Sequence, residues 1–179
     1  MKKIFCFLMT LVIFSSCSST KKEEKPNASA PVQAEVQARE DEEFSRSTTN
    51  VSISKEEFLN DKREILEIIA KLSEIMTDYD YESWLKYIDR TSIEYWSNPT
   101  NLKNASKRLP IKNQRLSGLN DYFRMVFVPS RKGRSVEEIR YISRDSVKAV
   151  EVREDTDVVY YNFTKEDGRW MVKIPPLQG

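Results

Sequence analysis

The spacing of apolar residues changes once in this chain of 179 residues, at Pro129. From Ser54 to Pro129, apolar side chains recur every three or four residues, which is the period of helices that bury one face. After Pro129, Val, Ile, Tyr, Phe and Trp alternate with polar residues, which is typical of strands. Helices followed by an antiparallel meander predict an α+β fold, in which the helices cover one face of a curved sheet of three to four or more strands.

The helical part has recognisable starts and ends. A capping box at Ser54-Lys-Glu-Glu57 begins a long helix, because the Ser hydroxyl and the Glu carboxylate can satisfy free amides. Asn98-Pro99 supplies an N-cap and a proline at the first helical position. We expect a short turn opened by Thr91 and helices from Ser54 to about Asp78, from Asp80 to Ile88, from Asn98 to about Leu109, and from Ser117 to Val128, where Pro129 ends the last one.

The part after Pro129 contains four stretches rich in strand-forming residues, at 136–142, 147–153, 158–164 and 169–174. Glu154-Asp-Thr and Glu166-Asp167-Gly168 separate the last three stretches and carry residues that favour tight hairpin turns. These signals predict neighbouring antiparallel strands in chain order.

The first sixteen residues have the pattern of an export signal. Lys2 and Lys3 precede an apolar run from Ile4 to Phe14, and two small serines follow it. The run has about half of the ~20 residues that span a bilayer. We therefore expect residues 1–16 to be a cleaved signal peptide rather than a transmembrane helix.

The end of this segment, Phe14-Ser15-Ser16-Cys17, resembles the lipobox of bacterial lipoproteins. The resemblance implies that Cys17 becomes the first mature residue and carries a diacylglycerol on its thiol and a fatty acyl chain, such as palmitate, on its amine. Each buried methylene contributes about 0.8 kcal/mol, so two or three chains hold a protein on a lipid bilayer. The rest of the chain then lies in the cell envelope, at the outer membrane or the periplasmic face. The alternative is an ordinary signal peptide that leaves Cys17 unmodified.

Residues 17–52 contain almost no large apolar side chain and are rich in Lys, Glu, Ala, Gln and Pro. Such a segment buries too little apolar surface to offset the entropy of ordering. We expect it to be a disordered tether, and residues 53–179 to form a single α+β domain of one modest core.

Residue types missing from 53–179 exclude several functions. The chain has no histidine, and its two cysteines, Cys6 and Cys17, both precede the domain. A disulfide, a Cys- or His-based metal site, a Cys nucleophile and a Ser-His-Asp triad are therefore excluded there. Ser83 stands where a calcium loop needs glycine, so we expect no metal site and no cofactor, although four acidic residues have the spacing of such a loop: Asp78, Asp80, Glu82 and Asp89.

Two aromatic motifs carry a further resemblance. Tyr81, Trp84 and Tyr87 lie at helical spacing, and the stretch from Tyr160 to Ile174 contains Asp-Gly followed by Trp-Met-Val. Together they resemble the SnoaL-like, or nuclear transport factor two-like, superfamily over roughly residues 55–176. The resemblance implies a cone of helices on a curved sheet. Enzymes of this superfamily use an Asp, Glu or His base with tyrosine donors, but no catalytic residue carries over, because no carboxylate here aligns with a known base.

The aromatic residues allow two interpretations. At helical spacing they are ordinarily core, but they could also line a ligand pocket. The candidates are Tyr81, Trp84, Tyr87, Tyr95, Trp96, Tyr122 and Phe123. Asp89 is expected to cap a helix end; buried near Tyr95, it could instead act as a base in proton abstraction.

Positive charge is concentrated between Lys103 and Arg144, with eleven Lys or Arg against three carboxylates. The most clustered members are Lys107, Arg108, Arg131, Lys132 and Arg134. They form either a solvated surface or a patch for an anionic partner, namely a phospholipid head group, a wall polymer or an acidic envelope protein. Nucleic acid is not expected in the envelope.

These observations favour a membrane-anchored envelope lipoprotein with a non-enzymatic binding or interaction domain. One alternative is a dehydratase or isomerase that uses Asp89 and a tyrosine. Another is a purely structural envelope component. No oligomeric state is predicted.

Overall fold

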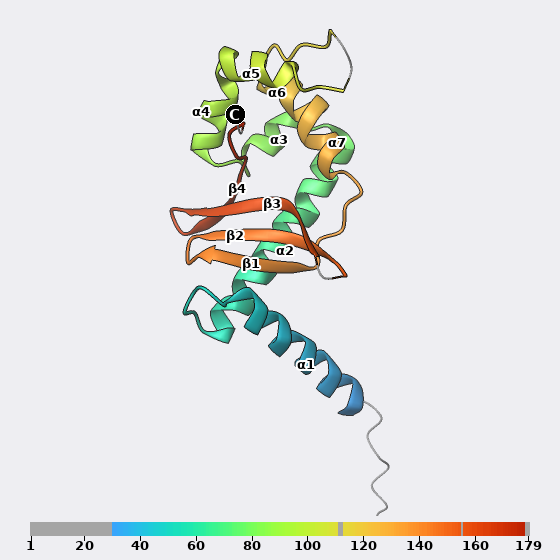
Figure 1. Ribbon diagram of the computed structural model, residues 1–179, viewed down its shortest axis with the longest axis vertical. Helices are drawn as coiled ribbons and strands as arrows, with labels where there is room; N and C mark the ends of the chain where they lie inside the picture. Colours follow the sequence, from blue (N-terminus) through green and yellow to red (C-terminus); the bar gives the residue numbers. More distant parts are fainter. Residues whose placement is uncertain (1–29, 111–112, 155, 178–179) are drawn as a thin grey trace, which may run out of the picture.

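The computed structural model describes residues 30–110, 113–154 and 156–177, with side chains described from residue 33 onward. The expected signal peptide, Cys17 and the first part of the expected tether lie outside these residues. Figure 1 shows a four-stranded sheet crossed by helix α2, with α1 at one end of the long axis and α3 to α7 gathered at the other. The helical elements are α1 Ala30–Ser47, α2 Lys55–Asp78, α3 Tyr81–Leu85, α4 Arg90–Ser97, α5 Pro99–Ser106, α6 Leu119–Tyr122, a π-helix Phe123–Phe127 and α7 Val128–Arg131.

The sheet is an antiparallel meander, so the predicted α+β class is confirmed. Its strands are β1 Glu138–Ser143, β2 Ser146–Arg153, β3 Thr156–Glu166 and β4 Arg169–Lys173, in the order β1-β2-β3-β4. Asp167 and Gly168 have φ of 49° and 78° and join β3 to β4. Two central residues with positive φ match the right-handed twist of the flanking strands. The sheet is open, not closed into a barrel.

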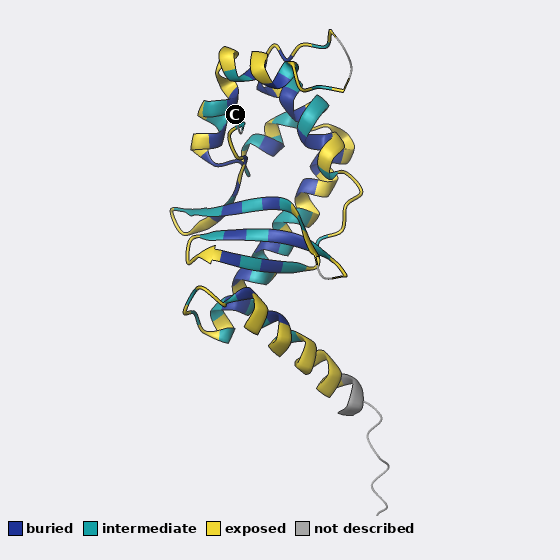
Figure 2. Ribbon diagram, in the orientation of Figure 1, coloured by how far each residue is buried: buried dark blue, intermediate teal, exposed yellow. Residues whose placement is uncertain are grey.

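Helix α2 supplies much of the core beneath the sheet. The Oγ of Ser54 accepts a hydrogen bond of 3.1 Å from the amide of Glu57, as the capping box predicted. Phe58, Ile65 and Leu72 lie seven residues apart on one face of the helix, and all three are fully buried. A fully buried side chain of this size contributes about 1.5–3 kcal/mol. Figure 2 shows the resulting buried stripe where α2 lies against the strands.

Helix α1 corrects the prediction of a disordered tether, which is wrong from Ala30 to Ser47. Its first described turns are exposed, but Glu43 and Ser47 are buried and Phe44 packs edge-on against Phe58 at 5.4 Å. Ion pairs at i,i+4 join Glu42 to Arg46 and, two turns earlier, Glu35 to Arg39. The helix docks mainly by polar contacts. The spacing of apolar residues therefore does not predict it.

Helix α3 ends at Leu85, not at Ile88 as predicted, because the next residues join the sheet. Ile88 forms a parallel bridge with Val172 of β4. The amide of Asp89 donates to the Val172 carbonyl at 3.0 Å, and the Val172 amide donates to the Tyr87 carbonyl at 2.7 Å. These bonds satisfy backbone groups at the free edge of β4.

Two other helix boundaries differ from the predictions. Helix α4 begins at Arg90 with Asp89 as its N-cap, so the turn does not start at Thr91. Helix α5 has the predicted start, with Asn98 as N-cap and Pro99 in its first turn, but it ends at Ser106 rather than near Leu109.

The helix after Gly118 continues through Pro129, which was expected to end it. Gly118, not Ser117, is its N-cap. A π-helical turn occupies Phe123–Phe127, and the Val128 amide donates to the Phe123 carbonyl five residues back. Pro129 therefore falls in the first turn of α7, where a missing amide costs little.

Candidate anion-binding site

The aromatic group proposed as a pocket is mostly core. Trp84, Trp96, Tyr122 and Phe123 are at most 5 % exposed. Trp96 stacks on Tyr122 with ring centroids 4.2 Å apart, and Trp84 packs on Phe123 at 5.0 Å. Such ring pairs add about 0.5–1.5 kcal/mol beyond their area burial. Their packing explains the helical spacing without a ligand.

The other aromatic candidates are partly buried around this cluster. Tyr81 packs against Trp84 at 5.9 Å, and Tyr87 and Tyr95 lie at the edge of the core. The hydroxyl of Tyr95 accepts a hydrogen bond of 3.2 Å from the amide of Leu177 and so holds the C-terminal segment. Two members of the group, Trp96 and Tyr122, line a small pocket of about 230 Å³ together with Arg108.

Asp89 is a buried helix cap. Its Oδ1 accepts from the Ser92 amide at 2.9 Å, and its Oδ2 accepts from the Thr91 hydroxyl at 2.7 Å. The Ser92 hydroxyl in turn accepts from the Ile174 amide at 2.8 Å. Both carboxylate oxygens therefore have structural partners within the chain.

Part of the predicted basic patch is not a free surface. The guanidinium of Arg131 lies 4.1 Å above the ring of Phe127, and its Nε donates to the Tyr160 carbonyl at 3.0 Å. Burial lowers the pKa of Arg131, although the neighbouring Tyr122 and Tyr161 oppose that shift. Arg131 therefore belongs to the packing between α7 and β3.

Lys132 and Arg134 follow Arg131 in the sequence, and each lies over the ring of a different tyrosine. Lys132 lies 5.4 Å from the ring centroid of Tyr79, and Arg134 lies 5.8 Å from that of Tyr160. Lys107 belongs to a different place, the C-terminal end of α5. Arg131, Lys132 and Arg134 therefore contact different aromatic rings, and Lys107 lies at the end of another helix.

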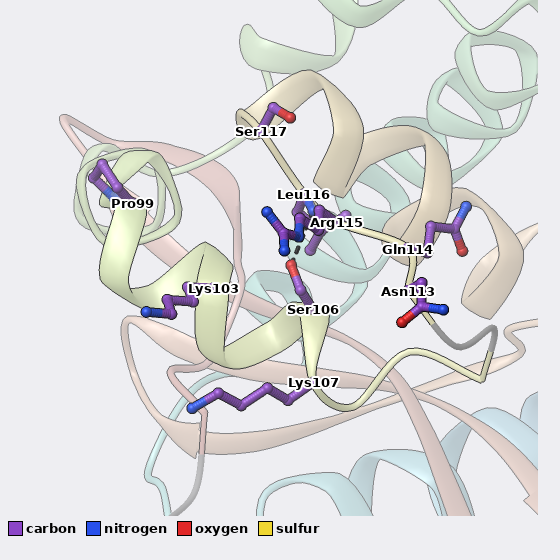
Figure 3. Close-up of a pocket in the computed structure, with 9 residues that line it drawn as sticks. All are labelled: Pro99, Lys103, Ser106, Lys107, Asn113, Gln114, Arg115, Leu116 and Ser117. Carbon is purple, nitrogen blue, oxygen red and sulfur yellow. Dashed lines mark hydrogen bonds between the residues drawn. The ribbon is translucent and has the colours of Figure 1, made fainter.

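A pocket of about 690 Å³ lies between α5 and the segment that precedes α6. Figure 3 shows lysines projecting from α5 and an arginine from the facing segment. Nine residues line this pocket, which we call the α5 pocket: Pro99, Lys103, Ser106, Lys107, Asn113, Gln114, Arg115, Leu116 and Ser117. Its volume lies within the usual ~300–1,000 Å³ of ligand sites.

All the charged side chains that line the α5 pocket are positive. Lys103, Lys107 and Arg115 are exposed, and no carboxylate is among the nine lining residues. Within the described parts of the chain, none of these three cations forms an ion pair. Lys103 and Lys107 are four residues apart on a helical turn, where like charges destabilise a helix by a few tenths of a kcal/mol.

Hydrogen bonds fix the two walls of the α5 pocket relative to each other. The Oγ of Ser106 accepts from the Leu116 amide at 2.9 Å and donates to the Leu102 carbonyl at 2.8 Å. The amide of Ser117 donates to Asp121 at 2.8 Å. Leu116 is 5 % exposed and anchors the segment in the core. The cations thus extend from a preformed backbone.

Sequence reasoning identified the basic stretch, but of the nine residues that line the α5 pocket it named only Lys107 as a site candidate. Lys103 and Arg115 are single charges without a charged neighbour in sequence, and Asn113 has no local signal except its left-handed backbone, φ 66°. Asn tolerates that conformation better than most residues. The available signal was the absence of acidic residues between Lys103 and Arg115.

Sequence reasoning also missed a buried carboxylate. Asp61, on α2, is 6 % exposed and accepts hydrogen bonds from Tyr141, Lys165 and Trp170. It occupies a position on the α2 stripe that is otherwise apolar. The contacts are all internal, which indicates a structural role.

Comparison with known proteins identifies a similar lipoprotein. A protein of Treponema pallidum (strain Nichols) named "Uncharacterized lipoprotein" is 32 % identical over 120 residues, which is 67 % of this chain and 64 % of that protein. The match thus spans less than two thirds of the relative. No protein family and no solved structure matches the chain.

By its name the relative is a lipoprotein. Across residues 30–110, 113–154 and 156–177, every helix is too short or too polar to traverse a bilayer.

Proposed function

We propose that this chain is an envelope lipoprotein, anchored through acylated Cys17, whose domain binds an anionic partner without catalysing a reaction. The lipobox-like Phe14-Ser15-Ser16-Cys17 and the similarity to a lipoprotein support the anchor. Binding is carried by one observation: three cations line the α5 pocket, and no carboxylate is among its nine lining residues. Charge-assisted hydrogen bonds to phosphate or carboxylate are about twice as strong as neutral ones.

Binding without catalysis is favoured by the state of the candidate base. Asp89 is 1 % exposed, and its two oxygens are engaged by Ser92 and Thr91. A general base must reach the proton that it removes, directly or through one water. A dehydratase or isomerase at Asp89 would require this cap to open.

The anchor is tested by metabolic labelling with a radioactive palmitate in a bacterial host that acylates lipoproteins. The wild-type chain should become labelled, and the Cys17→Ala variant should not. The Cys6→Ala variant is the matched control, because Cys6 lies inside the expected signal and should leave labelling unchanged. Absence of label on wild-type protein in that host contradicts the anchor.

Anion binding is tested by an NMR titration of the full-length protein in detergent with inorganic phosphate. Amide signals of residues 103–107 and 113–117 should shift, and the affinity should fall steeply with added salt, since exposed charges are screened. Lys103→Ala and Arg115→Ala should each weaken binding about three- to tenfold. Lys132→Ala, which removes a cation beside Tyr79, should have no effect. Shifts elsewhere in the chain, unaffected by Lys103→Ala, would refute this site.

A further inference from the structure

The α5 pocket has two chemically different sides. Figure 3 shows Lys103 and Lys107 extending from α5, while Asn113 and Gln114 lie along the facing segment, with Arg115 between the two groups. Asn and Gln side chains each offer a carbonyl acceptor and two N–H donors. One side therefore suits an anionic group and the other suits neutral groups that both donate and accept hydrogen bonds.

The lining argues against two common classes of ligand. Pro99 and Leu116 are the apolar members, and none of the nine lining residues is aromatic. An acyl chain needs a largely apolar lining. A nucleobase is ordinarily held by stacking on an aromatic ring or an arginine plane. A ligand rich in hydroxyl groups needs neither an apolar lining nor a ring to stack on.

The charge and the volume set two further limits. Three cations without an acidic neighbour in the lining favour a group with at least two negative charges, and a guanidinium can hold two oxygens of such a group at once. The volume of about 690 Å³ is much larger than a single phosphate ion requires.

The position of the pocket separates it from the anchored end of the chain. Helix α5 lies at the end of the long axis opposite the start of α1, from which the chain leads back toward Cys17 (Figure 1). A ligand from the surrounding compartment can reach this end directly.

We infer that the α5 pocket binds a phosphorylated sugar, with the phosphate on Lys103, Lys107 and Arg115 and the hydroxyls on Asn113 and Gln114. This inference rests on the proposed anion-binding function and names its ligand class. The hydroxyls of a sugar donate and accept in the same way as the two amides. Binding involves no bond making or breaking.

The experiment compares three probes on the full-length protein in detergent: glucose 6-phosphate, inorganic phosphate and glucose. Glucose 6-phosphate should bind at least tenfold more tightly than inorganic phosphate, and glucose should not bind measurably. Gln114→Ala should lower affinity for glucose 6-phosphate at least fivefold and leave affinity for phosphate unchanged. Gln37→Ala, on the exposed part of α1, is the matched control and should alter neither.

The outcomes distinguish the two proposals. Equal affinity for phosphate and glucose 6-phosphate, with no effect of Gln114→Ala, would overturn the sugar and leave anion binding intact. Failure of both phosphate compounds to bind would overturn both proposals. Binding to vesicles of anionic phospholipid that is lost in Lys103→Ala, without binding of glucose 6-phosphate, would replace the sugar by a lipid head group.

Discussion

The hydroxyl of Tyr141 on β1 donates a hydrogen bond of 2.7 Å to the buried carboxylate of Asp61 on α2. The other oxygen of Asp61 accepts from the indole of Trp170 at 3.0 Å and from Lys165 at 3.2 Å. One carboxylate therefore ties α2 to strands β1, β3 and β4. Burial raises the pKa of Tyr141, and the hydrogen bond to Asp61 raises it further, so this phenol remains a donor.

Replacing Asp61 by Ala should cost about 3 kcal/mol of the free energy of unfolding. The substitution leaves a phenol and an indole N–H buried without an acceptor, and each such group costs about 1–3 kcal/mol. Asp61→Asn should cost less, because the amide oxygen can still accept. Urea unfolding measures these changes. Glu67→Ala, an exposed position on α2, is the control and should stay within about 0.5 kcal/mol. A loss below 1 kcal/mol for Asp61→Ala would contradict the network.

Helix α1 should depend on polar contacts with the edge strand β1. The hydroxyl of Ser47 donates to the Ile139 carbonyl, and the Ile139 amide donates to Glu43 at 3.4 Å. Glu43 also pairs with Lys62. These side chains occupy backbone groups that an open edge strand would offer to another chain. The docking of α1 thus protects the edge of the sheet.

Ser47→Ala should therefore increase hydrogen exchange in α1 and at Ile139, with a loss of about 0.5–1.5 kcal/mol, because it removes one hydrogen bond while Arg140 still donates to the Ile139 carbonyl at 3.0 Å. Ser45→Ala, at an exposed position two residues earlier, should change neither quantity. Hydrogen exchange followed by mass spectrometry makes the comparison. Unchanged exchange in Ser47→Ala would contradict a role of the Ser47 hydrogen bond in holding α1 on β1.

Two tyrosines should make the protein sensitive to alkali. Burial raises the pKa of Tyr122 and of Tyr161 to about 12 each, and nearby Arg131 only partly opposes it. Both pKa values exceed the ordinary value of 10.0. The resulting stability is complete below pH 10 and is lost as the pH rises toward about 12.

A spectrophotometric titration of tyrosinate detects these groups. Part of the absorbance change should occur only above pH 10, together with unfolding, and Tyr122→Phe should reduce that late fraction. Completion of the whole titration around pH 10, while the protein stays folded, would refute the prediction.

Elements that are stabilised by neighbouring residues could be predicted from the sequence, and elements that depend on distant residues could not. The start of α2 at Ser54 and the hairpin at Asp167-Gly168 were predictable, because caps and tight turns are stabilised by neighbouring residues. The end of α3 at Leu85 was not, because Ile88 pairs with Val172, which is distant in sequence. Helix α1 was missed because its docking depends on polar contacts with Ile139 and Lys62.

The sequence by itself determined the α+β class, the periodicity of the core, the export-signal pattern ending at Cys17, and the absence of histidine and cysteine from the domain. Each follows from residue types or short-range spacing. Only the tertiary structure placed Arg131 against Phe127 and Tyr160 and brought Lys103 and Arg115 to the lining of one pocket. The order of charges along the chain does not specify which side chains line the same pocket, because that depends on where α5 and the following segment pack.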